Sequence, residues 1–214
     1  MDKEIANLYE SGKVELAVKK LVKRIDSDPK NVDNYLQLST YLIDQNSIDQ
    51  ALELLQKAST VVEDSKDLTY NLAVCYYIKG DFKKSLSLLD ELENTQETLY
   101  QKALVFLKLG QYQKALAYAL SLTNQDERTL ELLGDIWLSL GDLKQAKENY
   151  LKIKTEDRNA KVEFLLGLTL LEESLEQAQV HFDLSKQKNP TYFKQANTQY
   201  ASLLKLIRGQ NGNK

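Results

Sequence analysis

His181 is the only histidine in the chain, and its residue type most directly suggests chemistry. It stands in the sequence HFDLS, so Asp183 and Ser185, the other two residue types of a nucleophilic triad, follow it closely. On a helix His181 and Ser185 can share a face, whereas Asp183 points about 200° away from His181. The sequence therefore predicts no triad, and we interpret His181 as a surface or half-buried helical residue.

Cys75 is the only cysteine, which excludes an internal disulfide framework and every metal site that needs several cysteines. It stands beside the apolar residues Leu72 and Tyr76, so we expect it to pack in a core. A redox role would need a lowered pKa, and Lys79 is the only cation at helical spacing. Trp137 is likewise expected to be a core aromatic residue. The sequence thus predicts no catalytic residue, no metal site and no cofactor, and an enzyme is the least supported class.

The charge balance argues against nucleic acid and membrane partners. The chain has 28 Lys and Arg against 31 Asp and Glu, a formal net charge of −3, so there is no global basic field. The one basic cluster, residues 19–24, is offset by Glu15 and Asp26 and is interpreted as a solvated helix face. No stretch approaches the ~20 apolar residues of a membrane-spanning helix. We therefore expect a cytoplasmic protein.

The elements that must position these side chains recur along the chain. A small residue marks the second helix of each expected helix pair, at steps of 34, 34, 30, 31 and 32 residues. The first helices repeat a matching apolar pattern, best seen in residues 129–153, where Gly134 and Ala146 are small enough for two helices to approach closely. Gly141 should end the first helix of this pair, and Asp142 should cap the second. The small residues are Ala17, Ala51, Ser85, Ala115, Ala146 and Ala178.

This pattern resembles the tetratricopeptide repeat, W-x2-L-G-x2-Y followed by A-x3-F and P. Leu130–Tyr150 keeps the spacing throughout, with Leu130 in place of the tryptophan, and the proline recurs at Pro29 and Pro190. The resemblance covers roughly residues 2–190. It implies an all-α fold, a right-handed α-solenoid of about six helix pairs. Small free-standing bacterial proteins of this family are similar in size and composition, which implies a bacterial source.

We expect a single solenoid domain over residues 1–208. A covering helix over residues 191–208 should end at Gly209, and residues 209–214 should form a flexible tail. The third pair loses about one helical turn, so its second helix should be shorter. The expected repeats are residues 2–29, 32–63, 66–93, 96–123, 127–156 and 160–190.

A second stripe of side chains runs along the first helices, beside the core stripe. In the family that the chain resembles, the first helices line the inside of a superhelix, so this stripe implies a groove that is apolar and aromatic in its middle. Toward the C-terminal side the same register predicts an acidic patch. An open alternative is that several of these side chains pack between neighbouring repeats. The predicted groove residues are Leu36, Thr40, Tyr70, Asn71, Val74, Tyr100, Gln101, Leu104, Glu131 and Asp135.

The predicted function is non-catalytic binding of a peptide or helical segment of a partner protein in this groove. Tyr70, Tyr100 and Leu104 are the expected anchors. A clamp for a C-terminal carboxylate, known in this family, is not expected, because tyrosine, leucine and aspartate stand where cations or amides would be needed. Two alternatives remain: self-association, with the groove occupied by another copy, and RNA binding, which would need a basic track.

Overall fold

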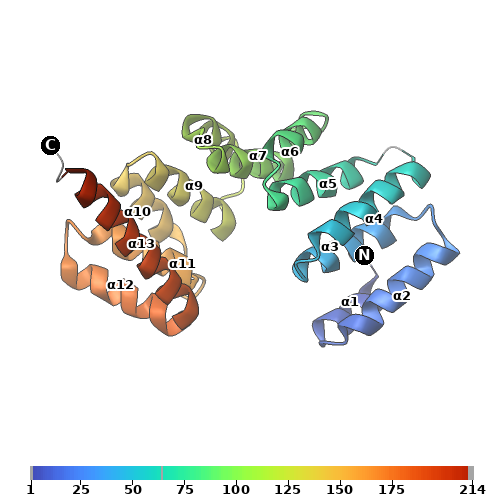
Figure 1. Ribbon diagram of the computed structural model, residues 1–214, viewed down its shortest axis with the longest axis horizontal. Helices are drawn as coiled ribbons and strands as arrows, with labels where there is room; N and C mark the ends of the chain where they lie inside the picture. The colour runs from blue at the N-terminus through green and yellow to red at the C-terminus, as the bar shows by residue number, and fades with distance from the viewer. Residues whose placement is uncertain (1, 64, 212–214) are drawn as a thin grey trace. The chain divides into compact units, whose positions relative to one another are not determined.

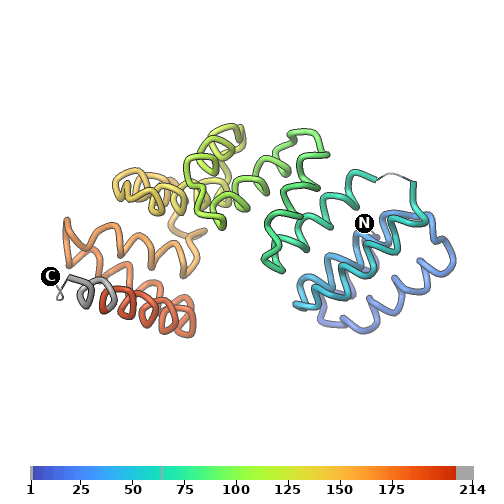
Figure 2. Tube along the Cα trace, turned by 45° about the horizontal axis from the view of Figure 1, so that its top comes forward, coloured from blue at the N-terminus to red at the C-terminus, as the bar shows by residue number. Residues whose placement is uncertain are grey.

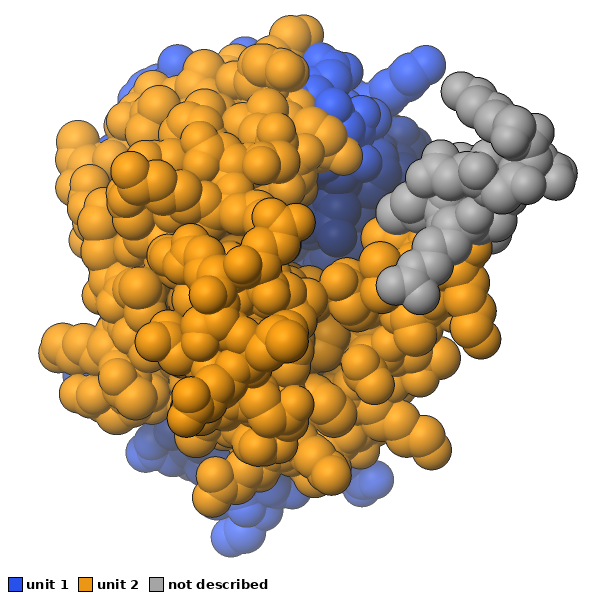
Figure 3. Space-filling model, turned by 90° about the vertical axis from the view of Figure 1, so that its left-hand side faces the viewer, with its two compact units in different colours: residues 1–111 blue, residues 112–214 orange. Residues whose placement is uncertain are grey.

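The computed structural model describes residues 2–63 and 65–211, with side chains described as far as Lys205. These residues form thirteen helices and no strand, which confirms the predicted all-α fold (Figure 1). Within each unit the chain turns back after each helix, so consecutive helices lie side by side (Figure 2). The chain divides into two compact units, Met1–Gln111 and Tyr112–Lys214 (Figure 3). A single continuous solenoid over residues 1–208 stays a prediction.

Unit 1 consists of seven described helices, and each helix packs on the next. The first helices of successive pairs also touch, because α5 contacts both α3 and α7. Side-chain N-caps start five of them and satisfy backbone N–H groups that would otherwise lack partners. These caps are Asp2, Asn31, Ser65, Asp81 and Thr95. The helices are α1 (Lys3–Glu10), α2 (Val14–Ser27), α3 (Val32–Asp44), α4 (Ile48–Val61), α5 (Lys66–Lys79), α6 (Phe82–Asp90) and α7 (Gln96–Lys108).

Unit 2 contains six described helices, and α13 contacts both α11 and α12. Asp142 caps α10 by accepting a hydrogen bond from the Gln145 N–H, and Gly141 has φ +83°, so both expectations at this turn are confirmed. The helices are α8 (Tyr112–Leu120), α9 (Glu127–Ser139), α10 (Leu143–Lys152), α11 (Ala160–Leu170), α12 (Leu175–Lys188) and α13 (Pro190–Asn211).

Small residues let the two helices of a pair approach closely, as the sequence predicts. All six small residues of the second helices are buried. Gly134 of α9 lies directly against the ring of Tyr150 of α10, because an added Cβ would lie 2.3 Å from Tyr150 Cε1. In unit 1 the Ser85 hydroxyl donates a 2.8 Å hydrogen bond to the Ala73 carbonyl, which ties α6 to α5. Large apolar side chains can then interlock around these contacts.

The second helices differ in length. Helices α2, α4 and α12 have 14 residues each, whereas α6 and α8 have 9 and α10 has 10. The prediction that the second helix of the third pair is shorter is confirmed. Loss of a whole turn keeps the remaining side chains on their faces, so Leu89 stays fully buried in this short helix.

Helix α13 covers the end of unit 2 through its first turns. The rings of Phe193 and Tyr192 pack on Phe164 of α11, at centroid distances of 5.9 and 6.4 Å. Leu203, further along, is 54% exposed. The helix does not end at Gly209 but continues to Asn211, because glycine tolerates helical dihedrals even though it favours helix ends. The last residues of the expected tail, 212–214, lie outside the described residues.

Among residues 2–63 and 65–211, none of the helices combines the length and the apolarity needed to cross a lipid bilayer.

Candidate functional site

Three first helices of unit 1 carry predicted groove residues in the same register, which we call the first-helix surface. Its members lie on α3, on α5 and on α7, and α5 contacts both of the other two helices. Each is half-buried, so part of every side chain meets solvent. Leu36 and Tyr70 also pack on core clusters beneath them, which fixes the lower part of each side chain. The surface consists of Leu36, Thr40, Tyr70, Asn71, Val74, Tyr100 and Leu104.

The two amide residues among the predicted groove residues have different environments. Asn71 Nδ2 donates a 3.2 Å hydrogen bond to the Ser39 hydroxyl on α3, so its side chain links two first helices. Gln101 is only 5% exposed, and its Nε2 atom has no hydrogen-bond partner among the described residues. Gln101 therefore carries an unsatisfied buried donor, which is uncommon in folded proteins.

A pocket of about 290 Å³ opens where α5 and α7 begin. Tyr70 belongs both to the first-helix surface and to the wall of this pocket, so the two features are continuous. The charged residues Lys66 and Glu93 form an ion pair at its rim. The pocket is lined by Lys66, Asp67 and Tyr70 of α5, by Leu92, Glu93 and Thr95 of the α6–α7 connection, and by Glu97 and Thr98 of α7.

The remaining predicted groove residues, Glu131 and Asp135, lie on α9 in unit 2. Lys161 of α11 pairs with both carboxylates, at 2.7 Å from Glu131, and Asp135 also accepts a 2.7 Å hydrogen bond from the Tyr150 hydroxyl. Burial raises the pKa of Asp135 despite the nearby ammonium. Burial alone would lower the pKa of Lys161, but the Asp135 and Glu131 charges outweigh it and raise that pKa. Lys161 therefore offsets one of the two carboxylate charges of the expected acidic patch.

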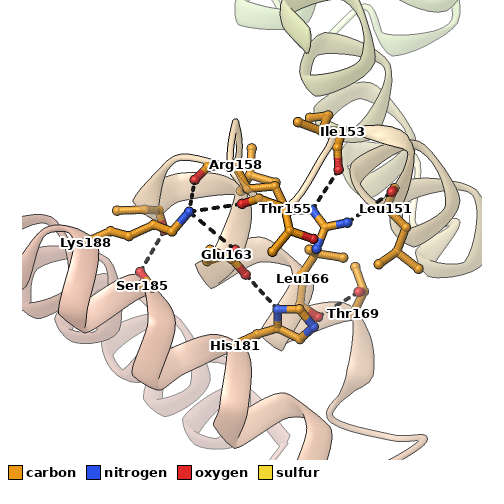
Figure 4. A network of polar contacts seen from close by, with 12 residues as sticks. Leu151, Ile153, Thr155, Arg158, Glu163, Leu166, Thr169, His181, Ser185 and Lys188 are labelled. Carbon is orange, nitrogen blue, oxygen red and sulfur yellow. Dashed lines mark hydrogen bonds and ion pairs between the residues drawn. The ribbon is translucent and has the colours of Figure 1, made fainter.

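His181 belongs to a polar network around the buried Glu163 and not to a triad, as Figure 4 shows. Its Nδ1 lies 2.7 Å from Glu163 Oε2, and Lys188 Nζ lies 3.7 Å from Glu163 Oε1. The Ser185 hydroxyl donates a 2.7 Å hydrogen bond to the Ala160 carbonyl, so it is a structural contact between α12 and α11. The Glu163 carboxylate is fully buried, and it joins two helices. Sequence reasoning missed Glu163, although its position between the apolar residues Val162 and Phe164 was a signal.

The other singled-out residues pack as expected. Cys75 is fully buried, and burial raises the pKa of its thiol to about 11, so the reactive thiolate is disfavoured. Lys79 instead pairs with Asp49 at 2.6 Å. Trp137 is half-buried against the core of unit 2. Within the part of the chain that the structure describes, no group of three His, Cys, Asp or Glu residues is placed to hold a metal ion.

Two family models of the tetratricopeptide repeat match residues 42–105 and 96–129. A TPR repeat-containing protein, MJ1428 of Methanocaldococcus jannaschii, is 24% identical over 181 residues, which cover 80% of this chain and 32% of that protein. The chain thus spans about a third of the length of this relative.

Solved structures share the fold. PilW, described as a widely conserved type IV pilus biogenesis factor, aligns with a TM-score of 0.76 at 17% identity over 88% of this chain and 91% of PilW. YrrB, described as a TPR protein with an unusual peptide-binding site, aligns with a TM-score of 0.54 at 20% identity over 83% of this chain and 97% of YrrB. The repeated helix pairs and these likenesses agree: residues 42–105 and 96–129 match the tetratricopeptide repeat, and the described helices share the fold of proteins built from that repeat.

Proposed function

We propose that the protein is a non-catalytic scaffold that binds an extended or helical segment of a partner protein on the first-helix surface of unit 1. One observation carries the proposal: apolar and aromatic side chains from α3, α5 and α7 lie in one register and are partly exposed, and the core beneath holds Leu36 and Tyr70 in place. Tetratricopeptide repeats generally serve protein–protein interaction, which supports this proposal. YrrB, which shares the fold and is described as having a peptide-binding site, is a further precedent.

Tyr70 and Tyr100 are the proposed anchors because an aromatic ring brings much apolar area with few rotatable bonds. Removing ~100 Å² of their apolar surface from water would contribute roughly 2.5 kcal/mol to binding. Val74 and Leu104 extend the apolar surface beside them. The core contacts beneath Tyr70 restrict its motion before binding, so less conformational entropy is lost when a partner arrives.

The test compares proteins retained from a host lysate by the wild type and by Tyr70→Ala/Tyr100→Ala. We expect the double variant to lose specific partners, because each tyrosine truncation at an interface can cost about 2 kcal/mol or more. Val61→Ala is the matched control: Val61 is an exposed apolar residue of unit 1 on the second helix α4, outside the first-helix surface. Circular dichroism would verify that all three proteins are folded. Equal retention by wild type and double variant would refute the proposal.

A second candidate function is self-association through apolar residues. Leu175 and Val180 of α12 and Leu203 of α13 are 72%, 54% and 54% exposed, so unit 2 also presents apolar side chains to solvent. Sedimentation over a range of protein concentrations separates the two functions. A chain that remains monomeric throughout excludes self-association and leaves the first-helix surface open to a different protein.

A further inference from the structure

The pocket beside Tyr70 has the size of a subsite for one side chain. Its volume of about 290 Å³ lies at the lower end of the range of small-molecule pockets, roughly 300–1,000 Å³. It continues from the first-helix surface through Tyr70, which takes part in both. A segment bound on that surface can therefore place one of its side chains in the pocket.

The charges around the pocket favour a cation. Three carboxylates, Asp67, Glu93 and Glu97, stand against the single ammonium of Lys66, which leaves a formal charge of −2. Lys66 pairs with Glu93, whereas Asp67 and Glu97 have no ion-pair partner among the described residues.

A simpler explanation of Asp67 and Glu97 is that they complement the dipoles of α5 and α7, since each stands in a first helical turn. Each helix N-terminus carries about half a positive charge, so two termini supply about one charge. This offsets only about half of the formal charge of −2. The Ser65 and Thr95 caps already accept hydrogen bonds from the Leu68 and Thr98 N–H groups. The pocket thus remains negative after its helix ends are taken into account.

The wall of the pocket also suits the stem of a basic side chain. The Tyr70 ring offers a face for a cation or for methylene groups. Acidic charge and an aromatic face therefore occur together at this end of the surface.

We propose that the pocket receives a lysine or arginine side chain of the partner segment, next to apolar side chains that lie on Tyr100 and Leu104. The partner is accordingly a segment in which a basic residue stands at a constant spacing from apolar residues. This inference rests on the proposed function of the first-helix surface and adds to it the chemistry of the bound segment.

The experiment uses the full chain and a display library of short random peptides. We expect the enriched peptides to carry Lys or Arg at a constant spacing from apolar residues. In one such peptide, replacement of the basic residue by Met should weaken binding to the wild type about tenfold. Asp67→Asn/Glu97→Gln should bind the basic peptide about tenfold more weakly and should no longer distinguish it from the Met peptide.

Asp44→Asn/Glu63→Gln is the matched control, because it removes two carboxylates of unit 1 that do not line the pocket. It should retain the preference for the basic peptide. Suppose that the selected peptides bind Tyr100→Ala/Leu104→Ala more weakly than the wild type but share no Lys or Arg position. This result would overturn the inference and leave the proposed function standing. The same conclusion would follow if they share such a position but Asp67→Asn/Glu97→Gln still distinguishes the basic peptide from the Met peptide. Failure to select any peptide whose binding depends on Tyr100 and Leu104 would overturn both.

Discussion

Residues in the same repeat register meet different partners on the neighbouring first helix of unit 1. Asn71 on α5 finds the Ser39 hydroxyl on α3. Gln101 holds the equivalent position on α7, but the residue of α5 that corresponds to Ser39 is Ala73, which has no hydroxyl. The hydroxyl that satisfies Asn71 is therefore absent from the corresponding position of the helix beside Gln101.

Gln101→Met should keep or raise the stability of the chain. The substitution conserves shape and removes a buried donor without a partner, and such a donor costs about 1–3 kcal/mol. Asn71→Leu should instead destabilise the chain, by roughly 0.5–1.5 kcal/mol for the lost hydrogen bond. Urea unfolding followed by circular dichroism measures both. A Gln101→Met protein clearly less stable than wild type would show that the amide is satisfied in solution.

Cys75 should make stability depend on alkaline pH. Its thiol pKa rises from 9.0 to about 11 on folding, so the folded chain holds the proton more tightly than the unfolded chain. The resulting stabilisation is complete below pH 9 and is lost as the pH rises through about 11. The loss amounts to roughly 2–3 kcal/mol, from about 1.36 kcal/mol per pKa unit.

Other groups also titrate in this pH range, so the measurement is a difference. The unfolding free energies of wild type and Cys75→Ala are compared at neutral pH and at pH values above the shifted pKa. The unfolding free energy of the wild type should fall relative to that of Cys75→Ala as the pH rises. If the difference between the two free energies does not change with pH, the thiol is not shielded from water.

At the scale of elements, α13 stabilises unit 2 through its first turns. Phe193→Ala should lower the unfolding free energy by about 2–4 kcal/mol, because its ring packs on Phe164 and on Phe182. Leu203→Ala on the same helix should change stability by less than about 1 kcal/mol, since Leu203 is 54% exposed. Thermal or urea unfolding measures both. Similar effects of the two substitutions would show that the whole helix, and not its first turns, packs on unit 2.

The helices were predictable from the sequence because the same local pattern of residues recurs in each repeat. Small residues, caps and apolar spacing recur, so Ala17 to Ala178 mark the second helices and Tyr70 and Tyr100 fall in one register. Contacts between polar side chains of different helices were not predictable in the same way. Lys161 reaches Glu131 and Asp135 across 30 and 26 residues, and Glu163 meets His181 across 18. Such pairs depend on where long side chains meet after packing, and the repeat pattern does not encode this.

The same limit applies to the pocket beside Tyr70. The repeat pattern predicted that Tyr70 lies on a first helix. Glu93 was not predictable in this way, because it stands in the connection between α6 and α7, outside the helical pattern. Lys66, Asp67 and Glu97 stand in first turns, where charged residues normally need no further explanation. Only the three-dimensional arrangement brings these groups around one cavity.

At the scale of the whole molecule, the proposed binding surface lies entirely within unit 1. In repeat proteins stability is approximately a sum over neighbouring repeats, so damage to one repeat has a mainly local effect. Gly134 of unit 2 offers a means to test this for binding. Gly134→Ala places a Cβ 2.3 Å from Tyr150 Cε1, and the Tyr150 hydroxyl is tied to Asp135, which hinders movement of the ring. We expect a loss of about 1–3 kcal/mol in the stability of unit 2 from this overpacking.

Binding of a peptide selected on the wild type should be unchanged in Gly134→Ala at temperatures where the variant is folded. Ser139→Ala, an exposed position on the same helix α9, is the control and should change neither stability nor affinity by much. Calorimetric unfolding gives the stability, and peptide titration gives the affinity. If Gly134→Ala weakens binding while circular dichroism shows a folded chain, then residues of unit 2 take part in binding, and the surface on α3, α5 and α7 is only part of the site. If affinity is retained while stability falls, the first-helix surface of unit 1 is sufficient, because the only region disturbed by the added methyl group is then one that the partner does not use.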